Sequence, residues 1–175
     1  MADYGFRMAV FTFHTFQLTP SATRSMISPV APSVKTAVLT NPNHKLTYVK
    51  KGIGADVQAK IAYVDQINIG LGMTDKQRKL VLGLIDHESA GTWSETIKGD
   101  NGCSTGIGQW NACPGSRRQA PKTFNEQAQL ICTEMKAKFD EFPDEIAVGK
   151  HNAPAWDSNP RYTAKVIKSS KLFNF

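Results

Sequence analysis

The residues best suited to chemistry lie in the stretch 74–111, and Glu88 is the central one. Four apolar residues precede it at helical spacing: Leu80, Val81, Leu84 and Ile85. At about 100° per residue, Glu88 falls in the middle of the face that these four form. Burial disfavours the charged form of a carboxyl group, so we expect a raised pKa at Glu88. A carboxylic acid that keeps its proton beside a cleft suits general-acid catalysis. The alternative is a solvent-exposed Glu88 in the last turn of the helix.

A loop rich in glycine and small polar residues follows this helix and contains a second candidate, Asp100. It is the only acid in the glycine-rich part of the loop, in Gly99-Asp100-Asn101-Gly102. Glycoside cleavage commonly uses two carboxyl groups, one as an acid and one as a base or nucleophile. Asp-Asn-Gly is also typical of a turn. Asp100 is therefore either a second catalytic carboxylate or a turn residue.

Four motifs, in the right order, carry a resemblance to a known family. Glu88-Ser89 is followed by a glycine-rich loop and by Gly106-Ile107-Gly108-Gln109. Next come His151-Asn152-Ala153-Pro154 and then Tyr162 with Ala164-Lys165-Val166. These resemble the Glu-Ser, Gly-Leu-Met-Gln, Tyr-Asn-Ala-Gly and C-terminal Tyr and Lys-Val motifs of the goose-type lysozymes and soluble lytic transglycosylases. The resemblance covers roughly residues 55 to 173.

The resemblance implies a lysozyme-like domain that cuts the β-1,4 bond between N-acetylmuramic acid and N-acetylglucosamine in peptidoglycan. In a lytic transglycosylase, which we favour, Glu88 would act as acid and then as base while the C6 hydroxyl of the sugar attacks. In a goose-type hydrolase, Asp100 would be the second catalytic group. The third interpretation is a non-enzymatic structural or wall-binding protein with this fold, since a fold does not determine activity.

The resemblance also implies a set of substrate-binding positions, and we expect hydrogen bonds from Ser104 and Gln109 to the sugar N-acetyl groups. Glycines in the loop motif would let the backbone approach the sugar closely. Three positions depart from the family, because His151 replaces a Tyr, Pro154 a Gly and Gly108 a Met. The implied substrate-binding residues are Ser104, Gly106, Ile107, Gln109, Asn152 and Tyr162.

No metal or other cofactor is expected, because the four histidines lack metal-ligand spacing and the three cysteines form no CxxC pair. Cys103 and Cys113 could form a disulfide that stabilises the loop by about 2–3 kcal/mol. Free thiols, in a protein folded in the cytoplasm, are the interpretation that we favour.

The helices that must position these residues have clear boundaries. Thr74–Gln77 and Thr123–Glu126 are both capping boxes, and Asn159-Pro160 is a typical start for the last helix. That helix should expose four cations, which are either solvated or in contact with the anionic wall: Arg161, Lys165, Lys168 and Lys171. We predict a mainly α domain of the α+β lysozyme-like type, with an active-site cleft and a small β element near residues 92–112.

The first 50 residues differ in composition from the rest. They contain one acid, five bases and many Pro, Ser and Thr residues. We predict an arm or attachment segment over 1–50 and the catalytic domain over 51–175. Residues 1–50 either pack on their own domain or dock on another protein, for which phage structural proteins are our candidates.

Charge and hydropathy restrict partner and location. The net charge of +6 and the pI near 9.3 predict an anionic partner. No motif favours nucleic acid, and no apolar run approaches the length of a membrane span. We expect peptidoglycan glycan strands as the partner. Without a clear signal peptide, we expect a phage particle or the host cytoplasm before release as the location, with action on the bacterial cell wall.

Overall fold

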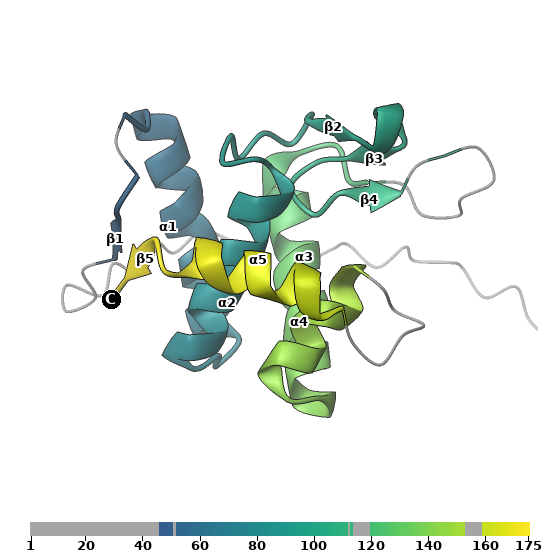
Figure 1. Cartoon of the computed structure of the whole chain (residues 1–175). Coiled ribbons are helices and arrows are strands. Elements are labelled where there is room, and N and C mark those ends of the chain that lie inside the picture. Colours follow the sequence, from purple (N-terminus) through teal and green to yellow (C-terminus); the bar gives the residue numbers. More distant parts are fainter. Residues whose placement is uncertain (1–45, 51, 112, 114–119, 153–158) are drawn as a thin grey trace, which may run out of the picture. The chain divides into compact units, whose positions relative to one another are not determined.

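The helices dominate the part of the chain that the structure describes, which in this computed structural model is residues 46–50, 52–111, 113, 120–152 and 159–175 (Figure 1). The helices are α1 (Ala55–Gly70), α2 (Asp75–Glu88), α3 (Phe124–Glu141), α4 (Asp144–Asn152) and α5 (Pro160–Ser170). The prediction of a mainly helical domain is confirmed. None of these described helices is both long and apolar enough to cross a membrane.

Two small antiparallel sheets accompany the helices. One pairs β1 (Thr47–Tyr48) with β5 (Phe173–Asn174). The other has three strands in the order β2 (Lys98–Gly99), β3 (Ser104–Thr105), β4 (Trp110–Asn111), with a short 3-10 turn over Asp100–Gly102. This second sheet confirms the small β element predicted near residues 92–112.

Helix α2 packs against all four other helices and carries the apolar face predicted from the sequence. The Thr74 side chain accepts a hydrogen bond from the Gln77 backbone, and the Gln77 side chain accepts one from the Thr74 backbone. The predicted capping box therefore sets the start of the helix. Its four predicted apolar residues are all buried: Leu80, Val81, Leu84 and Ile85.

The contact between α2 and α5 brings Glu88 and Tyr162 together, and Figure 1 shows α5 lying across α2. Their backbones meet at Gly83, where a Cβ atom would lie 2.5 Å from the backbone nitrogen of Ser170. Only glycine fits at such a distance without a shift of one helix. Gly83 thus allows α5 to lie close enough to α2 for Tyr162 to reach Glu88, five residues further along α2.

Helix α3 follows its predicted pattern, with one polar exception. Thr123 and Glu126 form the second capping box. Gln127 lies on the same side as the apolar residues and is 1% exposed. The predicted apolar stripe is buried throughout: Phe124, Ala128, Ile131, Met135 and Phe139.

The helical domain begins earlier in the chain than the predicted boundary at residue 51. Strand β1 pairs with β5, and the Tyr48 hydroxyl donates a hydrogen bond of 2.5 Å to Asp86 on α2. Composition alone missed this, because two strand residues in a polar segment give no periodic signal. The rest of the predicted arm, residues 1–45, lies outside the described residues.

Candidate active site

A cavity of ≈ 550 Å³ lies where the last residue of α2 meets the β2–β4 segment and helices α3 and α4. Its walls come from segments up to 64 residues apart in sequence, between Glu88 and Asn152. Five of the eight predicted site residues line it: Glu88, Asp100, Ser104, Gln109 and Asn152. The other three, Gly106, Ile107 and Tyr162, lie behind the wall.

Glu88 ends α2 and turns its carboxyl group into the cavity wall. Burial is the largest influence and raises the pKa of Glu88 above its ordinary value of 4.5. A hydrogen bond from Tyr162 lowers the pKa of Glu88, because it stabilises the charged form. The negative charge of Asp100 raises the pKa further. The net result is a raised pKa, as expected for a carboxyl group on the apolar face of a helix.

Tyr162 holds the Glu88 carboxyl group from α5. Its side chain is 7% exposed, and its hydroxyl donates a hydrogen bond to Oε1 of Glu88. Burial and the Glu88 charge raise the pKa of Tyr162, so the hydroxyl stays a neutral donor. Tyr162 therefore touches the candidate acid and not the open cavity.

His151 connects Tyr162 to the loop that contains Gly108. Its ring is stacked on the Tyr162 ring, with centroids 6.5 Å apart, and its Nε2 lies 3.2 Å from the backbone oxygen of Gly108. This contact links α4 to the loop between β3 and β4. His151 thus lies between Tyr162 and the glycine-rich loop.

Ser89, which follows Glu88, has a structural role at the end of α2. It is fully buried; its hydroxyl donates to the Ile85 backbone oxygen at 2.7 Å and accepts from the Trp93 backbone nitrogen at 3.1 Å. The hydroxyl thus ends α2 immediately after Glu88 and fixes the first turn of the loop.

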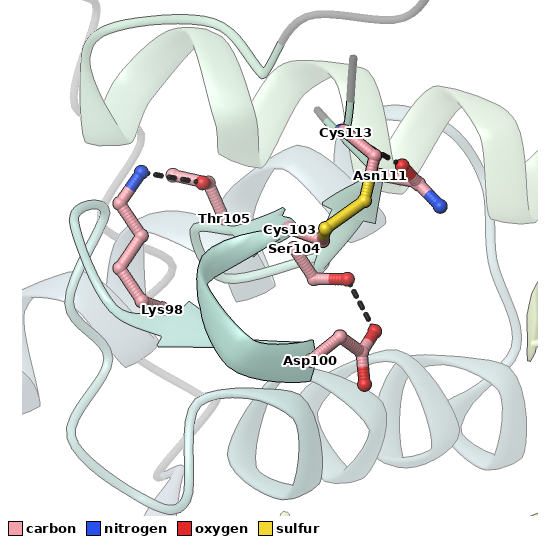
Figure 2. Close-up of a disulfide and its surroundings, with 7 residues drawn as sticks. All are labelled: Lys98, Asp100, Cys103, Ser104, Thr105, Asn111 and Cys113. Carbon is pink, nitrogen blue, oxygen red and sulfur yellow. Dashed lines mark hydrogen bonds between the residues drawn. A yellow bond between two sulfur atoms is a disulfide. The ribbon is translucent and has the colours of Figure 1, made fainter. Parts of the chain in front are cut away.

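Asp100, in the 3-10 turn after β2, and Ser104, at the start of β3, form a hydrogen-bonded pair (Figure 2). The Ser104 hydroxyl donates a hydrogen bond of 2.5 Å to Oδ2 of Asp100. Asp100 and Asn101 both adopt positive φ, 48° and 57°, a conformation that Asp and Asn tolerate better than most residues. The structure therefore gives Asp100 a turn conformation and a place in the cavity wall at the same time.

Gln109 lines the cavity, and its side chain also makes a hydrogen bond within the loop. Its Nε2 donates to the Gly106 backbone oxygen at 2.8 Å, and its own φ is 46°. A positive φ at a non-glycine residue is uncommon and is often found at functional sites. The Oε1 of Gln109 lies against Gly99, where an added Cβ would be 2.0 Å away.

Gln127 of α3 holds the loop and was missed by sequence reasoning. Its Oε1 accepts from the Ile107 backbone nitrogen at 3.0 Å, and its Nε2 donates to the backbone oxygens of Glu95 and Pro121. Gly106, with φ of 82°, makes room for it, since a Cβ there would lie 2.3 Å from Oε1. The available signal was a glutamine within an apolar stripe, the same kind of signal that identified Glu88.

A disulfide joins Cys103 to Cys113, so our preference for free thiols at these positions was wrong (Figure 2). The physical reason is the register of β3 and β4, which pairs Ser104 with Asn111 and so brings the two flanking cysteines to one end of the hairpin. The bond encloses the stretch 104–111, which supplies much of the cavity wall. Cys132 remains free and buried, and burial raises its pKa.

Five further residues line the cavity, besides the predicted site residues and the motif residues Gly108 and His151. Glu134 and Lys138 are one turn apart on α3, and Lys150 lies near the end of α4. The unpredicted lining residues are Trp110, Asn111, Glu134, Lys138 and Lys150. Charged residues on a helix normally face solvent, so only the packing of α3 and α4 reveals that these three face a cavity. Among the described residues, no group of three His, Cys, Asp or Glu side chains is placed to hold a metal ion.

No family model, curated protein or solved structure matches the chain. Any functional assignment therefore rests on the residues of the site and their chemistry.

Proposed function

We propose that the chain is a peptidoglycan lytic transglycosylase of the lysozyme-like kind, which cleaves the β-1,4 bond between N-acetylmuramic acid and N-acetylglucosamine. The observation that carries the proposal is Glu88. Its carboxyl group has a raised pKa, lines a cavity of ≈ 550 Å³ and is held by a neutral hydrogen-bond donor. A raised pKa is what a general acid near neutral pH requires. The sequence motifs around Glu88 supply the substrate class.

Glu88 would act first as an acid. Its Oε1 accepts the Tyr162 hydrogen bond, so the proton to be donated is carried by Oε2. Transfer of this proton to the glycosidic oxygen breaks the C1–O4 bond and releases the leaving sugar as an alcohol. The muramic acid ring then carries positive charge at C1, and Glu88 is left as a carboxylate that Tyr162 stabilises.

Glu88 would act second as a base. The carboxylate removes the proton from the C6 hydroxyl of the same muramic acid, and the C6 oxygen attacks C1. A 1,6-anhydro ring forms, Glu88 regains its proton and no water is consumed. One carboxyl group suffices for both steps, which leaves Asp100 free to shape the turn.

A hydrolase is the second candidate, and the position of Asp100 favours it. Asp100 lines the same cavity as Glu88, and its charge raises the pKa of Glu88. In an inverting enzyme a second carboxylate activates water on the far face of the sugar. Asp100 would have that role, with Ser104 orienting its carboxylate through the 2.5 Å hydrogen bond.

We further propose that the enzyme belongs to a bacteriophage, either carried in the particle or present in the host cytoplasm before release. In this proposal residues 1–45, the part of the predicted arm that precedes β1, attach it to phage structural proteins. The composition of this segment supports the proposal, with one acid against four bases. Detection of the chain in purified particles, and its loss when residues 1–45 are deleted, would test it.

Mass spectrometry of the products from purified sacculi tests the enzymatic proposal. We expect 1,6-anhydro ends from the native protein and at least a ~10²-fold slower reaction from Glu88→Gln, because the amide keeps the shape and removes the proton. Glu134→Gln is the matched control, since it makes the same change in the same cavity. Its activity should stay within about tenfold of native, the range of one ordinary hydrogen bond.

The other outcomes identify the alternatives. Reducing ends in place of anhydro ends would make the protein a hydrolase. Full activity in a well-folded Glu88→Gln variant would remove Glu88 from the mechanism. Binding to sacculi with no product at all would favour a non-enzymatic wall-binding protein.

A further inference from the structure

The exposed face of α5 gathers positive charge that the site does not use. Arg161, Lys165, Lys168 and Lys171 are all exposed. At about 100° per residue they lie within about 120° of one another on the helix, over about 15 Å of its length. No Asp or Glu occurs from residue 159 to the end of the chain at residue 175. The four residues form what we call the α5 stripe.

The four cations of the α5 stripe have no acidic partner among the described residues, whereas three lysines elsewhere on the domain do. Lys60 pairs with Asp56 and Glu95, Lys76 with Asp144 and Glu145, and Lys136 with Asp140. Within the described part of the chain, no ion pair involves any residue of the α5 stripe. The local structure therefore leaves this charge available to a partner.

Helix stability does not account for the stripe. Like charges three or four residues apart destabilise a helix, and the stripe contains three such pairs in succession. Lys168 and Lys171 lie at the C-terminal end, where cations are favourable, but Arg161 lies in the first turn, at the positive end of the helix dipole. Arg161 and Lys165 thus cost the helix stability, and an anionic partner would offset that cost.

One residue of the stripe lies close to the side chains that surround Glu88. Lys165 is close enough to His87 for its charge to lower the pKa of His87, after the larger effect of burial. The His87 ring in turn meets the edge of the Tyr162 ring, with centroids 5.5 Å apart, and Tyr162 holds Glu88. A long polymer bound at Glu88 could therefore continue onto α5.

We propose that the α5 stripe binds the carboxylates of the peptides that branch from the same peptidoglycan strand that the cavity cleaves. The choice of partner rests on the proposed function, because that function places a peptide-bearing glycan strand beside Lys165. Nucleic acid fits less well. Proteins that bind single strands stack bases on aromatic side chains. Tyr162 and Phe173 are buried, and the half-buried Phe175 ring packs against Arg78.

The test compares glycan strands that carry peptides with strands from which an amidase has removed them. The variant Arg161→Gln/Lys165→Gln/Lys168→Gln removes three charges from the stripe. Lys76→Gln/Lys122→Gln/Lys136→Gln removes three from elsewhere and is the matched control. On peptide-bearing strands we expect the stripe variant to raise KM about tenfold with kcat unchanged, the size expected of three exposed ion pairs. On peptide-free strands it should match the native protein.

Several outcomes overturn the proposal. The control variant should stay within about twofold of native on both strands; an equal KM rise in both variants would mean that only net charge matters. If the stripe variant raised KM equally on peptide-free strands, the peptides would not be the ligand. The same conclusion would follow if the stripe bound a DNA duplex more tightly than it binds peptide-bearing strands. Cleavage of peptide-free strands by the native protein shows separately that the proposed function holds. Circular dichroism should show both variants folded.

Discussion

The Tyr162 hydroxyl on α5 donates a hydrogen bond to Oε1 of Glu88 at the end of α2, 74 residues earlier in the chain. This contact opposes the effect of burial on the Glu88 pKa. It therefore sets how readily the proposed acid loses its proton and how well the carboxylate is stabilised after that loss. Both quantities matter if one carboxyl group is to act as acid and then as base.

Tyr162→Phe should shift the pH dependence of the reaction. The variant removes the donor that lowers the Glu88 pKa and keeps the ring, so the alkaline limb of kcat/KM against pH should move to higher pH. The rate at the optimum should fall by up to about tenfold, the range of one hydrogen bond. Tyr63→Phe on α1, where the ring packs near Phe124, is the control and should leave the profile unchanged. An unmoved alkaline limb in Tyr162→Phe would contradict the role given to this contact.

Glu88→Gln should stabilise the fold at neutral pH. Below the ordinary pKa of 4.5 the carboxyl group is protonated in both the folded and unfolded states, and it contributes no pH dependence. As pH rises through that value, the unfolded state ionises first because the folded pKa is higher, and the native protein loses stability. The variant should therefore melt at a higher temperature than native at pH 7, and the difference should vanish near pH 4.

The matched control for this effect is Glu126→Gln. Hydrogen bonds from Thr123 lower the pKa of Glu126, so the sign is reversed and no gain is expected at pH 7. Thermal unfolding followed by circular dichroism at both pH values gives the comparison. A Glu88→Gln protein less stable than native at pH 7 would mean that Glu88 is ionised without penalty in the fold.

Asp100→Asn should reduce activity less than about tenfold if the enzyme is a transglycosylase, within the range of one hydrogen bond. Asparagine tolerates the positive φ at this position, and its Oδ1 can still accept from Ser104. The change therefore removes the base and keeps the turn. In a hydrolase the loss should match that of Glu88→Gln and the native products should have reducing ends. Rates on sacculi, measured beside product spectra, separate the two cases.

Gly83→Ala should destabilise the domain, although alanine is the better helix former. The propensity gain is about 1 kcal/mol, whereas forcing a methyl group into a filled contact costs about 1–3 kcal/mol. The new Cβ would lie 2.5 Å from backbone, at Ser170, which cannot rotate away. Gly70→Ala, with nothing within 4 Å of its Cβ, is the control and should be neutral or stabilising. Urea unfolding of both variants measures the difference.

The same Gly83→Ala variant should also lose activity, because separation of α2 and α5 moves Tyr162 away from Glu88. A variant with native stability and native rates would mean that the helices do not depend on this close approach.

Local features of the sequence were sufficient to predict the helices and the candidate acid. Capping boxes at Thr74 and Thr123 set helix starts within a few residues, and the apolar periodicity of α2 placed Glu88 on the buried face before any packing was known. The Asp-Asn-Gly sequence indicated a turn at Asp100, which the structure contains. These rules act over one or two helical turns, so the sequence alone contains them.

Only the tertiary structure decided which side chains meet at Glu88. Three contacts depend on helix packing or strand register. They are the hydrogen bond from Tyr162 to Glu88, the hydrogen bond from the Ile107 backbone to Gln127 and the Cys103–Cys113 disulfide. The place of β1 beside β5 depends on the fold in the same way, and it moved the domain boundary. Periodicity shows which face of a helix is buried but not what lies against it, because that depends on the summed packing of segments distant in the chain.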